Sequence, residues 1–324
     1  MKRSILLLCS LLFAVVAVAQ TLPPMHYGDT SRTGKPFGKD PHVVRFNGRY
    51  LMYFTLPKGK TPPQNVLGIG IAESYDLVTW RKVGEITPEA DYESKGIAAP
   101  GALVRDGKVH LFYQTYGNRE KDAICHAVSE DGINFRRNPT NPIFSPTGEW
   151  NCGRAIDAEV AYYKGQYLLY FATRDKDYKV QMQGVATAPA STNFNREDWT
   201  QACDEPILKP ELAWEKKCIE ATSVIRRRGR LVMFYAGAYN NEPQQIGVAV
   251  SKDGLHWRRL SDKPFLTNGA PDEWNARESG HPHIFLDDDG RTYLFFQGNN
   301  KPGEWFLSNV EVFWRGWRPY LKKE

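Results

Sequence analysis

Cysteine is scarce in this chain, and the spacing of the cysteines disfavours the commonest cysteine-based site. Five cysteines are present, and no two of them form a Cys-x-x-Cys pair, so a structural zinc site is disfavoured. In an exported protein the cysteines beyond the N-terminal segment would be able to form disulfides, and separate thiols are the alternative. The spacing leaves both open for Cys125, Cys152, Cys203 and Cys218.

Long apolar runs are absent beyond the first residues of the chain. A basic pair at residues 2–3 precedes an apolar run at 5–16 and an Ala-Val-Ala sequence at 17–19. The run is shorter than the ~20 residues that a spanning helix needs. A basic start, a short apolar run and small residues are typical of a signal peptide. We therefore expect residues 1–19 to be a signal peptide that is cleaved between Ala19 and Gln20.

A strong excess of charge of either sign is also missing. The 42 Lys and Arg residues against 37 Asp and Glu residues give a formal net charge of +5. Only Arg226–Arg228 forms a basic cluster, which disfavours nucleic acid as a partner. We expect residues 20–324 to be a periplasmic or secreted monomer that is not inserted in a membrane.

Helical periodicity is weak throughout the chain, and a β-hairpin pattern recurs in its place. Each copy has an apolar segment, a turn such as Asn-Gly or Asp-Gly, and an aromatic-rich second segment. Five copies lie about sixty residues apart. Their first residues are Asp40, Ala99, Asp157, Glu220 and His281.

A second hairpin-like unit follows most copies, as at 246–257, so each repeat holds about four strands. Four-stranded units repeated around an axis predict an all-β fold, a five-bladed β-propeller with about four antiparallel strands per blade. The repeats fill nearly all of residues 20–324 without a linker, which predicts a single catalytic domain. An open β-sandwich is the alternative, but it does not require a fixed period.

The innermost strand of each blade would begin at the mouth of a central channel. The five copies place three acids and a histidine at these starts. A single acid at a strand start is usually a solvated loop residue, whereas four ionisable residues at equivalent positions indicate a site. Carboxylates that are brought together raise one another's pKa, which produces one proton donor and one ionised base near neutral pH.

Three acidic motifs in the chain resemble those of glycoside hydrolase family 43. They are Lys-Asp-Pro-His around Asp40, Ala-Ile-Asp-Ala-Glu around Asp157 and Cys-Ile-Glu-Ala-Thr around Glu220. The resemblance covers about residues 36–320 and implies a five-bladed propeller, shared with the related families 32, 62, 68 and 117. It implies that Asp40 is the general base of an inverting hydrolysis and Glu220 the general acid. Asp157 would orient Glu220 and raise its pKa.

His281 resembles a blade-five histidine of the same family that points into the channel near a calcium ion or water. Histidine is a poor direct ligand for a hard cation, so a water-mediated contact with the metal is expected. The resemblance implies no required cofactor and allows a structural Ca²⁺ in the channel. A histidine that is only hydrogen-bonded within the channel is the alternative.

Other residues near the strand starts are candidates for contacts with sugar. Two tryptophans in the preceding loops would stack on sugar rings, although their repetition also favours packing between blades. Two arginines are candidate donors to sugar hydroxyls, with surface salt bridges as the alternative. The candidate substrate-binding residues are His42, Trp150, Arg154, Trp214, Arg277 and His281.

These observations predict an exported glycoside hydrolase whose partner is a plant-type polysaccharide or oligosaccharide. The expected activity is that of an exo-acting α-L-arabinofuranosidase or a related β-xylosidase or galactosidase. A family 117-like or family 32-like glycosidase is an alternative, although the Trp-Met-Asn-Asp-Pro-Asn and Arg-Asp-Pro motifs of family 32 are absent. A carbohydrate-binding propeller without catalysis is the other alternative.

Overall fold

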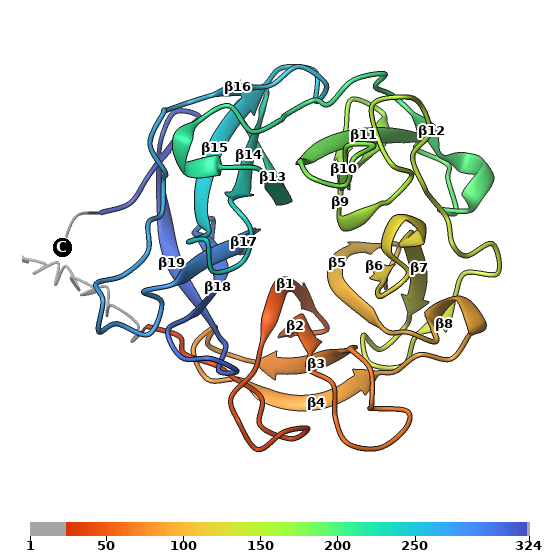
Figure 1. Cartoon of the computed structure of the whole chain (residues 1–324), viewed down its shortest axis with the longest axis vertical. Coiled ribbons are helices and arrows are strands. Elements are labelled where there is room, and N and C mark those ends of the chain that lie inside the picture. The colour runs from red at the N-terminus through yellow and green to blue at the C-terminus, as the bar shows by residue number, and fades with distance from the viewer. Residues whose placement is uncertain (1–23, 323–324) are drawn as a thin grey trace, which may run out of the picture.

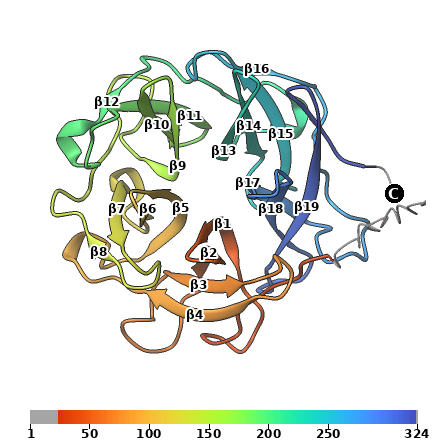
Figure 2. The same ribbon diagram turned by 180° about the vertical axis from the view of Figure 1, so that it is seen from behind.

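The computed structural model describes residues 24–322, which fold into five four-stranded sheets arranged around a central axis (Figures 1 and 2). The predicted five-bladed β-propeller is therefore confirmed. The predicted signal peptide, residues 1–19, lies outside the described residues.

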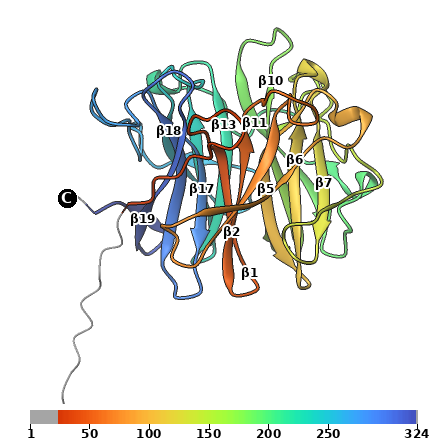
Figure 3. The same cartoon turned by 90° about the horizontal axis from the view of Figure 1, so that it is seen from below.

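Each blade is an antiparallel meander of strands that are consecutive in the chain. The first strand of each blade lies next to the channel, and the inner strands β1 and β5 run along its axis (Figure 3). The strands are β1 (Lys39–Phe46), β2 (Arg49–Leu56), β3 (Gly68–Ser74), β4 (Arg81–Ile86), β5 (Ile97–Arg105), β6 (Lys108–Thr115), β7 (Ile124–Ser129), β8 (Arg136–Arg137), β9 (Ile156–Tyr163), β10 (Gln166–Arg174), β11 (Gln181–Pro189), β12 (Thr200–Gln201), β13 (Ile219–Arg227), β14 (Arg230–Gly237), β15 (Gln245–Ser251), β16 (Arg258–Arg259), β17 (Glu278–Leu286), β18 (Thr292–Asn299), β19 (Phe306–Arg315) and β20 (Arg318–Tyr320). Short 3₁₀ turns occur at η1 (Asp91–Glu93), η2 (Arg119–Lys121), η3 (Arg196–Asp198) and η4 (Ala213–Glu215).

The hydrophobic core lies between the faces of adjacent blades. Leu51 and Tyr53 of β2, for example, pack in one cluster with Leu111 and Tyr113 of β6. Burying aromatic and aliphatic side chains between two sheets stabilises both blades, because neither blade can cover its own faces. This packing holds the inner strands in place around the channel.

Every inner strand is irregular close to its start, where one residue adopts a left-handed backbone conformation. These residues are Asp40, Ala99, Asp157, Ala221 and His281, with φ between 45° and 54°. In β13 the register of the ladder shifts between Glu220 and Ser223, so Ala221 is the counterpart of Asp40. From the sequence, Glu220 is predicted at the position equivalent to these strand starts. That prediction is wrong by one residue, because Ala221 occupies the position.

The turn glycines carry the signal for this offset. Gly48, which follows β1, comes eight residues after Asp40, and Gly229 comes eight residues after Ala221. Glu220 still reaches the channel, because the bulge that follows it redirects the strand.

The segment before β1 closes the ring against the last blade. Tyr27 exchanges two backbone hydrogen bonds with Leu307 of β19, of 2.9 and 2.7 Å. Met25 is buried beside these strands, and its carbonyl accepts a hydrogen bond from the Ser308 hydroxyl. The segment at residues 25–27 and strand β19 therefore hold each other in place.

Two further expectations concern the whole domain. The structure has separate thiols rather than disulfides at the four cysteines of the described chain, Cys125, Cys152, Cys203 and Cys218. None of the helices within residues 24–322 has the length and apolarity that crossing a bilayer requires.

We predict that Gly101→Ala destabilises the propeller by roughly 1–3 kcal/mol through overpacking. An added Cβ at Gly101 would lie 2.2 Å from the carbonyl oxygen of Ala158 in the next inner strand, and backbone cannot move aside cheaply. Urea unfolding of the variant measures the loss. The control is Gly84→Ala on β4, where the nearest atom to the added carbon would be a side-chain carbon of Ile133 at 3.1 Å. An equal loss in both variants would contradict the role of the inner-strand contact.

Candidate active site

The three predicted acids and His281 meet in one pocket at the starts of β1, β9, β13 and β17. The pocket has a volume of about 480 Å³, and Asp40, Asp157, Glu220 and His281 all line it. That volume is within the range of small-molecule sites in proteins. The side chains are almost completely buried, so their charges interact strongly.

His281 lies between two of the acids. Its Nδ1 is 2.9 Å from an oxygen of Asp40, and its Nε2 is 3.2 Å from an oxygen of Glu220. Burial alone would lower the pKa of His281, but the two carboxylates raise this pKa well above its usual value. The imidazole is therefore a cation between the proposed base and the proposed acid.

The Asp40 carboxyl is held in its ionised form. Burial would raise its pKa, but His281, Lys39 and a hydrogen bond from the Thr55 hydroxyl together lower it below the usual range. The Thr55 hydrogen bond to Asp40 is 2.5 Å long. An ionised carboxylate is the form that a general base requires.

The Glu220 carboxyl is surrounded by amide donors. Nε2 of Gln244 donates to it at 2.6 Å, Asn240 donates at 3.3 Å, and Nε2 of Gln181 also donates to it. Burial would raise the pKa of Glu220, yet the hydrogen bonds and charge of His281, with Gln244 and Lys39, lower it. The raised pKa that the resemblance implies for Glu220 is thus not found in the structure.

The raised pKa belongs to Asp157 instead. The pKa of Asp157 is raised to about 7, because burial and the charges of Glu220 and Asp40 outweigh the opposing charges of His281 and Arg154. Its Oδ2 is buried and has no hydrogen-bond partner among the described residues. Asp157 consequently keeps a proton at pH values below about 7.

Backbone groups of the inner strands are fixed by polar residues of the neighbouring blade. Gln297 of β18 accepts a hydrogen bond from the amide of Asp40 at 2.8 Å, and Gln114 of β6 accepts one from Asp157 at 2.7 Å. Thr55 of β2 accepts one from Ala99 at 2.8 Å. These positioning residues were missed, although each is a polar residue within a mostly apolar second strand.

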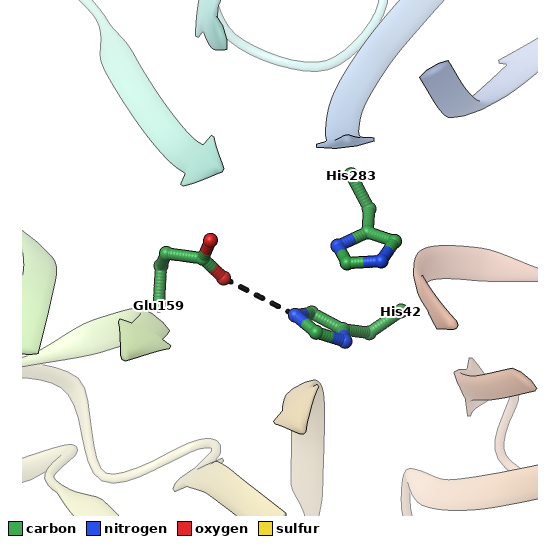
Figure 4. Close-up of side chains that lie close together, drawn as sticks. All are labelled: His42, Glu159 and His283. Carbon is green, nitrogen blue, oxygen red and sulfur yellow. Dashed lines mark hydrogen bonds and ion pairs between the residues drawn. The ribbon is translucent and has the colours of Figure 1, made fainter. Parts of the chain in front are cut away.

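A second layer of polar side chains lies deeper in the channel, two residues further along the inner strands. Figure 4 shows His42, Glu159 and His283 gathered there, with Nε2 of His42 donating to Glu159 at 3.1 Å. Nδ1 of His42 accepts from the amide of Ala102 at 3.2 Å, so the proton of this imidazole lies on Nε2. Burial lowers the pKa of His42 to about 3, so the ring is neutral.

The same layer continues through the remaining blades. Glu159 accepts hydrogen bonds from the amide of Val224 at 2.8 Å and from the Ser223 hydroxyl at 3.2 Å. Ser223 accepts from the amide of Ile284 at 3.1 Å, and Nε2 of His283 donates to the carbonyl of Val43 at 3.0 Å. These contacts link the inner strands of all five blades.

The described channel residues do not form a site that would bind a calcium ion directly. His42, Glu159 and His283 bring donor atoms within 4.8 Å of one another, but neither nitrogen of His42 has a free lone pair. Asp157, Glu220 and His281 also converge within 4.8 Å, where the positive charge of His281 would repel a cation. Calcium takes six to eight oxygen ligands, far more than either cluster offers.

The structure brings only two of the predicted substrate-binding residues, Arg154 and His281, to the pocket. His42 lies in the deeper layer and does not line it. The ring of Trp150 packs near Phe171, with centroids 6.5 Å apart, and Trp214 stacks on Tyr235.

Arg277 is exposed and is absent from the pocket lining. Trp150 and Trp214 therefore have a structural role, but each packs on the second strand of its own blade and not between blades as their repetition suggested. Pocket residues that sequence reasoning missed are Lys39, Tyr116, Arg174, Gln181, Tyr239, Asn240 and Trp305.

Comparison with known protein families identifies a family of glycoside hydrolases. Residues 33–313 match glycosyl hydrolases family 43. The chain belongs to this family. Among solved structures, this family 43 chain is similar to a thermostable family-43 glycoside hydrolase, with a TM-score of 0.71 and 19% identity over 89% of the chain and 93% of that protein. It is also similar to an endo-1,4-beta-xylanase from Bacteroides thetaiotaomicron VPI-5482, with a TM-score of 0.69 and 22% identity over 89% and 94%.

One curated relative of the family 43 chain is named as a phosphorylase and not as a hydrolase. It is a beta-1,2-mannobiose phosphorylase from Thermoanaerobacter sp. (strain X514), 30% identical over 115 residues. The match covers 31% of the chain and spans only 36% of that relative.

We predict that Asp157→Asn changes the pH dependence of stability. Because the folded protein keeps a proton on Asp157 up to pH about 7 and the unfolded chain releases it near the usual value of 3.8, the wild type loses stability as pH rises through this window. Asparagine does not titrate, so the free energy of unfolding of the variant should rise relative to the wild type by roughly 1–3 kcal/mol between pH 5 and 8. Urea unfolding across this range measures it.

The control for this measurement is Asp204→Asn, which removes an exposed carboxylate. It should leave the pH dependence as in the wild type. A difference between Asp157→Asn and wild type that stays constant with pH would show that Asp157 does not carry the proton.

Proposed function

We propose that the protein is an exported, inverting glycoside hydrolase that acts on plant-type polysaccharide or oligosaccharide. The observation that carries this proposal is the arrangement of Asp40, Asp157 and Glu220 around His281 in one buried pocket. Inverting hydrolysis needs an ionised carboxylate to activate water and a protonated carboxyl for the leaving oxygen. The low pKa of Asp40 supports its role as the base.

The proposed acid, Glu220, needs a proton, whereas its lowered pKa favours the ionised form. Asp157 holds a proton below pH about 7, and donor atoms of Asp157, Glu220 and His281 lie within 4.8 Å of one another. The groups form one coupled set, in which a proton belongs to the set rather than to a single residue. A bound sugar excludes water, which favours the neutral form of a carboxyl, and Glu220 then takes the proton that it gives to the leaving oxygen.

The family and the pocket support an exo-acting α-L-arabinofuranosidase, or a related β-xylosidase or galactosidase. A pocket of about 480 Å³ suits the end of a sugar chain better than an open groove would. The sequence motif at residues 1–19 supports export before folding. The small net charge and the lack of a basic stripe in the sequence support a protein without nucleic acid partners.

We predict that Asp40→Asn and Glu220→Gln each lower kcat on natural linkages by ~10²–10⁴-fold, the usual contribution of general base or acid catalysis. Substrates with activated aryl leaving groups need little protonation, so they should rescue Glu220→Gln and leave Asp40→Asn impaired. Release of sugar from aryl and natural substrates measures the difference. NMR of the first product should show an inverted anomeric configuration.

The matched control is Glu205→Gln, an exposed carboxylate that should keep wild-type rates. Aryl substrates that rescue Asp40→Asn instead of Glu220→Gln would reverse the two roles. Binding of sugars without any release of product would favour the non-catalytic carbohydrate-binding alternative.

A further inference from the structure

Two arginines lie side by side at the edge of the pocket. The guanidinium of Arg174 donates from Nε to Oε1 of Gln181 at 3.0 Å, and Nη1 of Arg154 donates to the same oxygen at 3.4 Å. Both arginines line the pocket together with Glu220. Two like charges that share one neutral acceptor repel each other, so their proximity needs an explanation beyond Gln181.

The charges of the pair are only partly balanced by the protein. Arg154 is buried and forms an ion pair with Asp122, at 3.4 Å. Within residues 24–322, Arg174 has no carboxylate within ion-pair distance, and no hydrogen-bond acceptor is found for its two terminal nitrogens. One cation beside the pocket thus lacks a counter-ion.

Aromatic rings hold Arg174 in place. Its Cζ lies 4.3 Å from the centroid of the Tyr178 ring and 5.0 Å from that of Tyr239. Stacking of a guanidinium on aromatic rings fixes its plane while leaving the edge free. The free edge of an arginine is a fork of N–H donors that matches a carboxylate or phosphate oxygen pair.

The position of the pair relative to the catalytic groups identifies which part of the substrate it would contact. Gln181, which both arginines contact, also donates to Glu220, so the pair lies on the side of the proposed acid. The leaving sugar departs on the side of the acid, whereas the attacking group enters on the side of the base, Asp40. An anion held by the pair therefore belongs to the leaving sugar and is not the attacking group.

We propose that Arg154 and Arg174 form an anion-binding subsite for the carboxylate of an acidic sugar in the leaving-group position. The enzyme then removes a neutral sugar from a uronic acid residue of an acidic polysaccharide. This inference rests on the proposed hydrolase function for the cleaved bond, while the binding of the uronate can be measured without any cleavage.

The first test measures binding of digalacturonate and of its methyl ester by calorimetry, in buffer without phosphate and at a pH where the carboxylates are ionised. A charge-assisted pair is lost in the ester, so we expect digalacturonate to bind roughly 10- to 100-fold more tightly. Arg174→Gln should bring this ratio close to one, and Arg174→Lys should retain part of it. The control is Arg258→Gln on the outer strand β16, where the arginine is exposed, and it should keep the wild-type ratio.

Equal binding of acid and ester by the wild type would overturn the subsite, as would a preference that survives in Arg174→Gln. Binding of inorganic phosphate that depends on Arg174, without binding of digalacturonate, would also overturn it and assign the pair to phosphate.

The second test compares kcat/KM for an α-L-arabinofuranosyl unit linked to galacturonic acid and to galactose. A preference of roughly 10-fold or more for the acidic substrate, reduced in Arg174→Gln, is expected. Cleavage of both substrates at equal rates overturns the subsite and leaves the hydrolase function intact. Tight, Arg174-dependent binding of the uronate without cleavage of either substrate would support the subsite and overturn the hydrolase function.

Discussion

The geometry of the site depends on a closed ring of hydrogen bonds across the axis, one layer beneath the proposed catalytic groups. A propeller blade that tilts or slides would move its inner strand, and with it one member of the catalytic set. The layer formed by His42, Glu159, Ser223 and His283 resists such movement, because each inner strand is tied to others through it. Buried polar networks of this kind are costly when one partner is lost, which makes the arrangement specific as well as stable.

The catalytic layer above this ring carries stored strain. Left-handed φ angles at Asp40, Asp157 and His281 are uncommon in strands, and they turn these side chains toward the axis. The core between blades holds the strands in these conformations. The ion pairs of His281 with Asp40 and Glu220 then reduce the repulsion between buried carboxylates, and the remaining proton is left to Asp157.

The sequence predicts the propeller, since hairpin turns and a sixty-residue period can be read from it directly, and it predicts most of the residues of the proposed catalytic set that meet in the pocket. It places Asp40, Asp157 and His281 correctly, and it misplaces Glu220 in the repeat because a bulge shifts its strand by one residue.

Which acid carries the proton is not a local property. It depends on distances between side chains from four different blades, and no spacing in the chain encodes those distances. The same holds for Arg174, which meets Arg154 at Gln181 of β11 and at the ring of Tyr178.

The contact between Tyr27 and Leu307 has a consequence for synthesis and transport. Because the first described strand segment completes the last blade, the ring remains open until nearly the whole chain has been made. If the protein is exported as we propose, an N-terminus held by an export apparatus would delay the pairing of Tyr27 with Leu307. Delayed closure would keep the propeller incompletely folded for as long as the N-terminus is held by that apparatus.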